Sequence, residues 1–435
     1  MHIQVNKPFE WSAPLPNFQR IQQDFPRPVV KDIQSEVTQA IDGIPDAASL
    51  IRGKRIAITA GSRGICQIVD ILAAVVKRIR DYEGQPVIIP SMGSHGGSTA
   101  EGQVEVLADL GITENSVGAP ILSSMEVVEI GKLSNDMPVY VDKIASQADG
   151  ILVLNRVKPH SDFTGEFESG LAKMLALGLG KQLGASTIHR YGVAGLQEYM
   201  PQAARLMTHK LPVIFGLAMV ENAYHEVAGI YAVPAGGIAG PEEQKLLELA
   251  YELMPEFPFH EIEVLIVEEI GKNISGVGMD PKVIGRVKVH GVTHNVCCQI
   301  RTIVALDLTN ETHGNASGIG LADIVTSRLL KKVDFEKLYI NCITAGICGI
   351  QRSFVPMVAP DDRSAILTAL RVCGNAHPMQ ARIVRIKNTL SLDVIDISES
   401  LVGKWISGRK VQPIGDAFSL RFDHQGKIEP FPALL

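Results

Sequence analysis

The sequence predicts an α/β fold of two domains, each built mostly from parallel βα units. A strand, a glycine-containing turn and a helix recur in this order along the N-terminal half. The length of 435 residues exceeds what one ordinary hydrophobic core serves. A proline-containing boundary lies at 255–258, and a new series of apolar strands starts after it. We therefore expect domains at 1–258 and 259–435.

The elements of the N-terminal domain follow from the alternation of apolar runs and turns. Short runs rich in Ile and Val precede segments whose apolar residues recur at helical spacing. The predicted elements are helices over 30–40, 68–80 and 99–110 and strands over 55–59, 86–90, 150–154 and 212–215. Ser98 or Thr99 would cap the last of these helices. The rest of the proline-rich first fifty residues is expected to be irregular.

The C-terminal domain shows the same βα rhythm less clearly. Its predicted elements are strands over 263–267, 302–306 and 338–343 and a helix over 320–332. The tail after Thr389 is expected to form short strands and turns.

The composition favours a globular protein and excludes several other classes. A hydrophobic content of 46% argues against disorder, and a net charge of −6 with no basic stripe argues against a nucleic-acid partner. The first residues lack the apolar region of a secretory signal, and no apolar run is long enough to span a membrane. The six cysteines include no CxxC pair, which favours reduced thiols over a zinc site. We expect a cytoplasmic protein without a membrane partner, and an oligomer is compatible with the sequence.

Three polar side chains lie in turns directly after predicted strands: Arg63, His95 and His160. In open α/β sheets, ligands bind outside the carboxyl ends of the strands. Arginine can hold a carboxylate or phosphate by two parallel hydrogen bonds, and histidine transfers protons near neutral pH. A surface arginine in a tight turn and ordinary loop histidines are the alternatives.

Two further candidates lie in the glycine-rich segment that follows. Lys173 is surrounded by apolar residues, where desolvation would lower its pKa and make the amine nucleophilic. A lysine that extends from a half-buried helix to solvent is the alternative. His189 could be a metal ligand or a core histidine. Farther along, His313 lies in a polar loop that could contact a hydroxylated substrate or could simply be a well-capped loop.

Several standard motifs have little or no support. His290 and His294 have the spacing of a helical metal pair, but their flanks alternate as in a strand, so strand and turn histidines are favoured. The sequence contains no HExxH, no GxGxxG after a strand and no P-loop motif, which argues against the corresponding zinc, dinucleotide and P-loop sites.

Taken in order, Arg63, His95, His160, Lys173 and His189 resemble the site of the nickel-pincer-dependent lactate racemase family. The resemblance extends from about residue 10 to past residue 340. Pro159–His160 and the interval from Lys173 to His189 are its most specific parts.

The resemblance implies a 2-hydroxyacid racemase or epimerase with its active site in the cleft between the two domains. The N-terminal domain would bind a nickel-pincer nucleotide, attached covalently through Lys173, with His189 as the nickel ligand. His95 and His160 would exchange protons with substrate, and Arg63 would bind its carboxylate. Enzymes that synthesise and insert the cofactor would be partners, in addition to the small-molecule substrate.

The sequence departs from the family pattern at several places. Ala60 replaces an acidic residue, and the stretch between His160 and Lys173 is longer. Lys288, or else Lys282, would correspond to a substrate-binding lysine of the second domain. These departures, with the loop around His313, favour a larger or more hydroxylated acid than lactate. A metal-dependent lyase or hydrolase with the same histidines and a non-catalytic hydroxy-acid-binding homologue are the alternatives.

Overall fold

The computed structural model describes residues 7–290, 292 and 298–431. The chain divides into two compact units, one formed by 26–254 and the other by the residues up to Phe25 together with those from Pro255 onward. The boundary after Met254 lies close to the expected one. The first residues differ from the expectation, because β1 (Phe18–Asp24) pairs with β14 (Val394–Ser398) and β15 (Lys410–Phe418).

The unit formed by 26–254 contains a five-stranded sheet in the order β3-β2-β6-β7-β8. The first four strands are parallel, and β8 is antiparallel to β7. The strands are β2 (Arg55–Ala60), β3 (Gln85–Pro90), β6 (Gly150–Arg156), β7 (Val213–Glu221) and β8 (Val227–Pro234), and a separate hairpin joins β4 (Val127–Lys132) and β5 (Pro138–Asp142).

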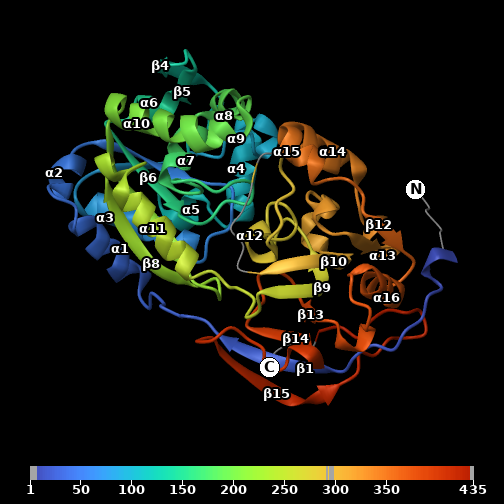
Figure 1. The fold of residues 1–435 in the computed structure, drawn as a ribbon. Helices are drawn as coiled ribbons and strands as arrows, with labels where there is room; N and C mark the ends of the chain where they lie inside the picture. Colours follow the sequence, from blue (N-terminus) through green and yellow to red (C-terminus); the bar gives the residue numbers. More distant parts are fainter. Residues whose placement is uncertain (1–6, 291, 293–297, 432–435) are drawn as a thin grey trace. The chain divides into compact units, whose positions relative to one another are not determined.

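Helices cover both faces of this sheet, because successive strand residues point to opposite sides. Ile56 and Ile58 pack with α1 and α3, whereas Ala57 packs on the other side with α10 and α11. Figure 1 shows these helices on the blue-to-yellow part of the chain. The helices are α1 (Ile33–Asp42), α2 (Ala47–Ile51), α3 (Ile68–Asp81), α4 (Ala100–Asp109), α5 (Glu114–Val117), α6 (Lys143–Ser146), α7 (Leu171–Lys173), α8 (Lys181–His189), α9 (Gly192–Ala194), α10 (Met200–Lys210) and α11 (Pro241–Glu252).

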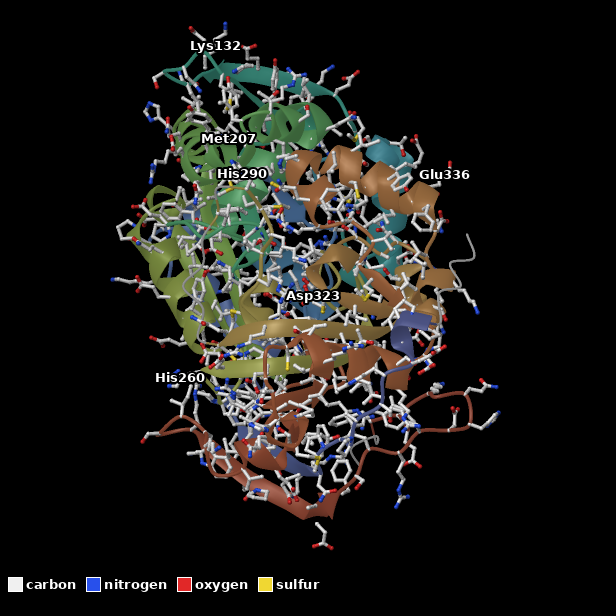
Figure 2. All side chains as sticks on the ribbon, turned by 45° about the vertical axis from the view of Figure 1, so that its right-hand side comes forward. Lys132, Met207, His260, His290, Asp323 and Glu336 are labelled. Atoms are coloured by element: carbon white, nitrogen blue, oxygen red, sulfur yellow. The ribbon has the colours of Figure 1, made fainter. Side chains whose placement is uncertain are left out.

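The other unit contains an eight-stranded sheet in the order β12-β11-β10-β9-β13-β14-β1-β15. The strands β12, β11, β10, β9 and β13 are parallel to one another. The strands β14, β1 and β15 each run antiparallel to the strand before them in this order. The elements not yet given are β9 (Glu261–Ile270), β10 (Gln299–Leu308), β11 (Ile324–Thr326), β12 (Met357–Ala359) and β13 (Ile383–Ile386), with helices α12 (Pro281–Ile284), α13 (Ser327–Lys331), α14 (Phe335–Thr344), α15 (Gly346–Gln351) and α16 (Asp362–Val372). Side chains fill the interior, and Asp323, labelled in Figure 2, pairs with Arg286 at 2.6 Å.

The α/β class with mostly parallel sheets is confirmed, but two predictions in the second domain are wrong. The segment 338–343 belongs to helix α14, whose start is capped by the Asp334 carboxylate accepting from the Lys337 amide. The predicted helix over 320–332 contains β11, and its helical part, α13, begins only after Thr326, whose hydroxyl caps it. The segment 338–343 is short and apolar, and periodicity alone does not separate a strand from a helix in such a run. The segment 320–332 is longer, and its apolar residues Ile324 and Val325 lie in the strand that precedes the helix.

Candidate active site

Arg63, His95 and His160 follow the carboxyl ends of β2, β3 and β6. These three strands are neighbours and run parallel, so their carboxyl ends meet at one edge of the sheet. This edge is where ligands bind in open α/β sheets. The structure therefore brings the three turns to one place.

The loop that carries His95 is fixed against the Lys173–His189 segment and against α4. The Gly93 amide donates to the Gly178 carbonyl at 3.2 Å, and the Gln103 side chain donates to the Gly93 carbonyl at 2.9 Å. Gly178 must be a glycine here, because a Cβ at this position would lie 2.7 Å from the Ser91 carbonyl oxygen. His95 itself is solvent-accessible, and its Nδ1 lies 2.7 Å from the Met92 carbonyl oxygen.

Lys173 is the last residue of α7, and a π-helical segment over Met174–Leu179 leads from it to α8, which ends at His189. The start of this helical run is held by the buried Glu243 carboxylate, which accepts from the Ala172 amide at 3.0 Å. π-Helical turns are rare and occur frequently at functional sites. One helical run therefore carries both Lys173 and His189.

Burial lowers the pKa of Lys173 to about 8. The Asp162 carboxylate acts against this shift, while the positive charges of Arg63 and Lys158 add to it. The Lys173 Nζ also lies 3.4 Å from the Ser169 hydroxyl. At neutral pH this amine is deprotonated far more often than an ordinary lysine, which makes it a better nucleophile.

His160 is held by its backbone and by its ring. Its amide donates to the Glu168 carboxylate at 2.5 Å, and this carboxylate also accepts from the Tyr251 hydroxyl at 2.8 Å. The His160 Nδ1 accepts from the Asp162 amide at 3.0 Å, and the ring packs against Phe163 with centroids 4.7 Å apart.

Arg63 and His189 share their electrostatic surroundings with Lys173. Both side chains are solvent-accessible, yet the protein around them desolvates their charged forms and so lowers the pKa of each. The charge of Arg156 lowers the pKa of Arg63 further, and that of Lys173 does the same for His189. The Asp162 carboxylate opposes all three shifts.

The sequence-based reasoning therefore missed Asp162 as the negative charge shared by these cations. The signal that could have found it is its position two residues after His160, in a polar loop at the same sheet edge. It also missed Lys181, which is fully buried and donates to the Pro90 carbonyl and to the Gln103 side chain at 2.9 Å. Lys181 also forms an ion pair with Asp142, with 3.2 Å between the charged atoms. Lys181 thereby ties α8 to the strand end that precedes His95.

Lys288 and His313 belong to the other unit. The Lys288 Nζ donates to the Gly320 carbonyl at 2.6 Å, and burial lowers the pKa of this lysine. The alternative, Lys282, lies in α12. His313 is exposed with φ +48°, and its carbonyl accepts from Lys337. Asn315 in the same loop donates to the Asn341 side chain at 3.3 Å.

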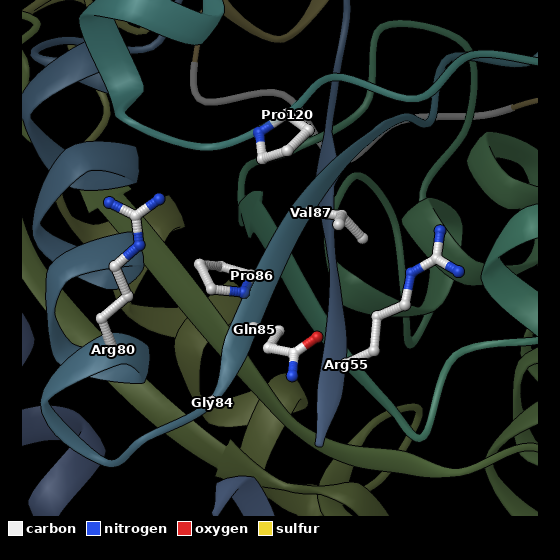
Figure 3. Close-up of a pocket in the computed structure, with 7 residues that line it drawn as sticks. All are labelled: Arg55, Arg80, Gly84, Gln85, Pro86, Val87 and Pro120. Atoms are coloured by element: carbon white, nitrogen blue, oxygen red, sulfur yellow. The ribbon is translucent and has the colours of Figure 1, made fainter. Parts of the chain in front are cut away.

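A pocket of about 320 Å³ lies at the opposite end of the sheet. Its lining includes Arg55, Gln85 and Pro86, at the amino ends of β2 and β3, and Pro120 (Figure 3). Since β2 and β3 separate it from the turns that carry Arg63 and His95, this pocket is not part of the candidate site.

Within 7–290, 292 and 298–431, no group of three or more His, Cys, Asp or Glu residues is arranged to hold a metal ion. His294 of the HxxxH pair lies outside the described residues. Across the same ranges, no helix is both long and apolar enough to cross a bilayer.

Comparison with known proteins relates the chain to lactate racemase. Residues 16–195 match the model of the lactate racemase N-terminal domain. The structure resembles that of the lactate racemase apoprotein from Thermoanaerobacterium thermosaccharolyticum, with a TM-score of 0.53 and 14% identity over 86% of this chain and 99% of that one. A Thermotoga maritima structural-genomics protein matches with a TM-score of 0.46 and 15% identity over 65% of this chain and 72% of that one. A search of curated protein sequences gives no significant match. The matched span contains the candidate-site residues from Arg63 to His189, so this part of the chain is a lactate racemase-like N-terminal domain.

Proposed function

We propose that this protein is an isomerase that racemises or epimerises a 2-hydroxy acid with a nickel-pincer nucleotide attached to Lys173. The observation that carries the proposal is the amine of Lys173, whose pKa burial lowers to about 8. It lies on one helical run with His189, at the sheet edge where the turns of Arg63, His95 and His160 meet.

The residues present fit the proposed cofactor. A partly deprotonated amine can be acylated and so form a covalent attachment. His189, at the end of α8, offers one imidazole and would be the nickel ligand. The positive charges of Arg63, Lys158 and Lys173 suit an anionic nucleotide. When bound, this group would accept the α-hydrogen of the substrate as hydride and return it to either face.

The residues of the chain would bind the substrate and move its proton. Arg63 would hold the substrate carboxylate by two parallel hydrogen bonds. A histidine takes the hydroxyl proton as the C–H bond breaks, which leaves a planar 2-keto acid. A proton returns to the oxygen when the hydrogen adds back to carbon, which restores the 2-hydroxy acid. His95 and His160 are the proposed proton carriers.

The substrate is proposed to be larger or more hydroxylated than lactate. Ala60 leaves the end of β2 without the acidic side chain of the lactate enzymes. In the second domain, Lys288, or less well Lys282, and His313 are proposed substrate contacts. The test is a panel of 2-hydroxy acids that differ in length and hydroxylation. Turnover of lactate alone would exclude the larger substrate.

The proposal includes a cytoplasmic location and transient contact with the enzymes that synthesise and insert the cofactor. The decisive experiment is co-expression with those enzymes, followed by the intact mass of the protein and peptide mapping. We expect a covalent adduct on Lys173 and none in Lys173→Arg, which keeps the positive charge. An unmodified wild-type chain would exclude the pincer mechanism. Activity without an adduct would favour the metal-dependent lyase or hydrolase, and binding without α-hydrogen exchange would favour a non-catalytic homologue.

A further inference from the structure

The ring nitrogens of His95 and His160 have backbone partners of opposite character. The His95 Nδ1 lies 2.7 Å from the Met92 carbonyl oxygen, and a carbonyl can only accept. This nitrogen must therefore carry a proton. The His160 Nδ1 lies 3.0 Å from the Asp162 amide nitrogen, and an amide N–H can only donate. This nitrogen must therefore offer its lone pair.

We infer that the backbone holds the two histidines in opposite tautomers, with His95 as the proton acceptor of the site and His160 as its hydrogen-bond donor. A neutral imidazole carries one proton on its two nitrogens. With Nδ1 protonated, His95 presents a lone pair at Nε2. With Nδ1 unprotonated, His160 presents an N–H at Nε2. This inference rests on the proposed function for its catalytic meaning, but not for its geometry.

The local structure fixes both partners. The His95 turn is held by the side chain of Gln103, which donates to the Gly93 carbonyl. The same side chain accepts from the buried Lys181. The His160 amide is anchored by Glu168 at 2.5 Å.

Among the contacts between described residues, that of the Asp162 carboxylate opposes the assignment for His160. The Asp162 carboxylate lies 4.0 Å from the His160 Nδ1 and would favour a proton there. That distance is beyond a hydrogen bond, whereas the Asp162 amide at 3.0 Å is within one. The nearer, directional contact therefore decides the tautomer. The carboxylate also accepts from the Ser161 hydroxyl at 2.7 Å.

The consequence is that the two histidines offer the substrate different chemistry. His95 can take a hydroxyl proton at Nε2 without any change. His160 can donate a hydrogen bond to the substrate oxygen, but to accept a proton at Nε2 it must first move its own proton to Nδ1 and lose the Asp162 amide bond. The resting protein is thus prepared for proton removal by His95 and not by His160.

The test is long-range ¹H–¹⁵N correlation NMR of the apoprotein, labelled with ¹⁵N-histidine, at a pH about two units above the ordinary histidine pKa of about 6.5. The signals that disappear in His95→Asn and in His160→Asn assign the two rings, and His95→Gln and His160→Gln replace any variant that fails to fold. We expect a protonated Nδ1 for His95 and a protonated Nε2 for His160. The same tautomer for both rings, averaged signals or a doubly protonated ring would overturn the inference.

The variant Asp162→Asn is the matched control, because it removes the side-chain carboxylate and keeps the backbone N–H of residue 162. We expect the His160 tautomer to remain in this variant, and a switch would show that the carboxylate and not the backbone sets it. Because these spectra need neither cofactor nor substrate, failure here is distinguishable from a missing Lys173 adduct, which would contradict the proposed function instead.

Discussion

The lowered pKa of Lys173 predicts an unusually reactive amine in the apoprotein. The pKa of about 8 compares with about 10.4 for an ordinary lysine. At pH 7, roughly 9% of the Lys173 side chains would be neutral, against roughly 0.04% of ordinary lysines. Lys173 would therefore offer about 200-fold more free amine, as a nucleophile for cofactor attachment requires.

The assay is brief acylation of the apoprotein over pH 6–11, with modification at each lysine measured by peptide mass spectrometry. Accessibility scales the rate at every pH equally, so the midpoint of the profile reports the pKa. We expect a midpoint near 8 for Lys173, with the exposed Lys210 of α10 as the internal reference.

Two variants probe the cause of the shift. Arg63→Gln should raise the midpoint, because the Arg63 charge lowers the pKa of Lys173, and Asp162→Asn should lower it, because the carboxylate raises that pKa. A Lys173 midpoint near 10 that neither variant moves would refute the electrostatic reasoning.

The same shift predicts a dependence of stability on pH. Below pH 8 Lys173 is protonated in both states, and its charge costs the folded state up to about 3 kcal/mol relative to a lysine with an unshifted pKa. Between pH 8 and about 10.4 the unfolded chain binds more protons, so the free energy of unfolding should rise with pH. Lys173→Met should remove this rise and stabilise the apoprotein at pH 7, and urea unfolding of both proteins measures the difference.

The remaining predictions concern activity and the buried ion pair. His95→Ala and His160→Ala should each reduce racemisation by about 10²–10⁴-fold while leaving the Lys173 adduct intact, as chiral product analysis and intact mass can determine; wild-type rates in either variant would contradict a role in proton transfer. Arg63→Lys should raise KM, because an ammonium cannot form the planar pair with a carboxylate, and unchanged substrate affinity would count against this anchor. Lys181→Met should destabilise the fold by about 3–5 kcal/mol, because it leaves Asp142 buried without its cation. Adding Asp142→Asn should recover part of this loss in urea unfolding, and no recovery would show that packing dominates.

The sequence was sufficient for the elements with clear periodicity and for the residues directly after them. Apolar runs followed by glycine turns located β2, β3 and β6, and Arg63, His95 and His160 lie where those strands end. Strand ends are local features, and the carboxyl ends of parallel neighbours meet at one edge wherever such a sheet forms.

The sequence was insufficient to predict elements whose secondary structure depends on long-range contacts. β1 lies in a proline-rich segment and forms because β14 and β15, more than 350 residues away in the chain, supply its partners. The apolar run 338–343 is a different case, because the cap of its helix, Asp334, is a local signal that the strand prediction did not use. Short runs of this kind take the structure that their surroundings favour.

The sequence by itself thus determined which side chains could do chemistry, their order and their family resemblance. Only the tertiary structure decided the protonation behaviour of these side chains. The pKa of Lys173 depends on burial and on Asp162, and the tautomers of His95 and His160 depend on a carbonyl and an amide that face their rings. The sequence specifies the residue types, whereas desolvation and the direction of hydrogen bonds arise only after distant segments have packed together.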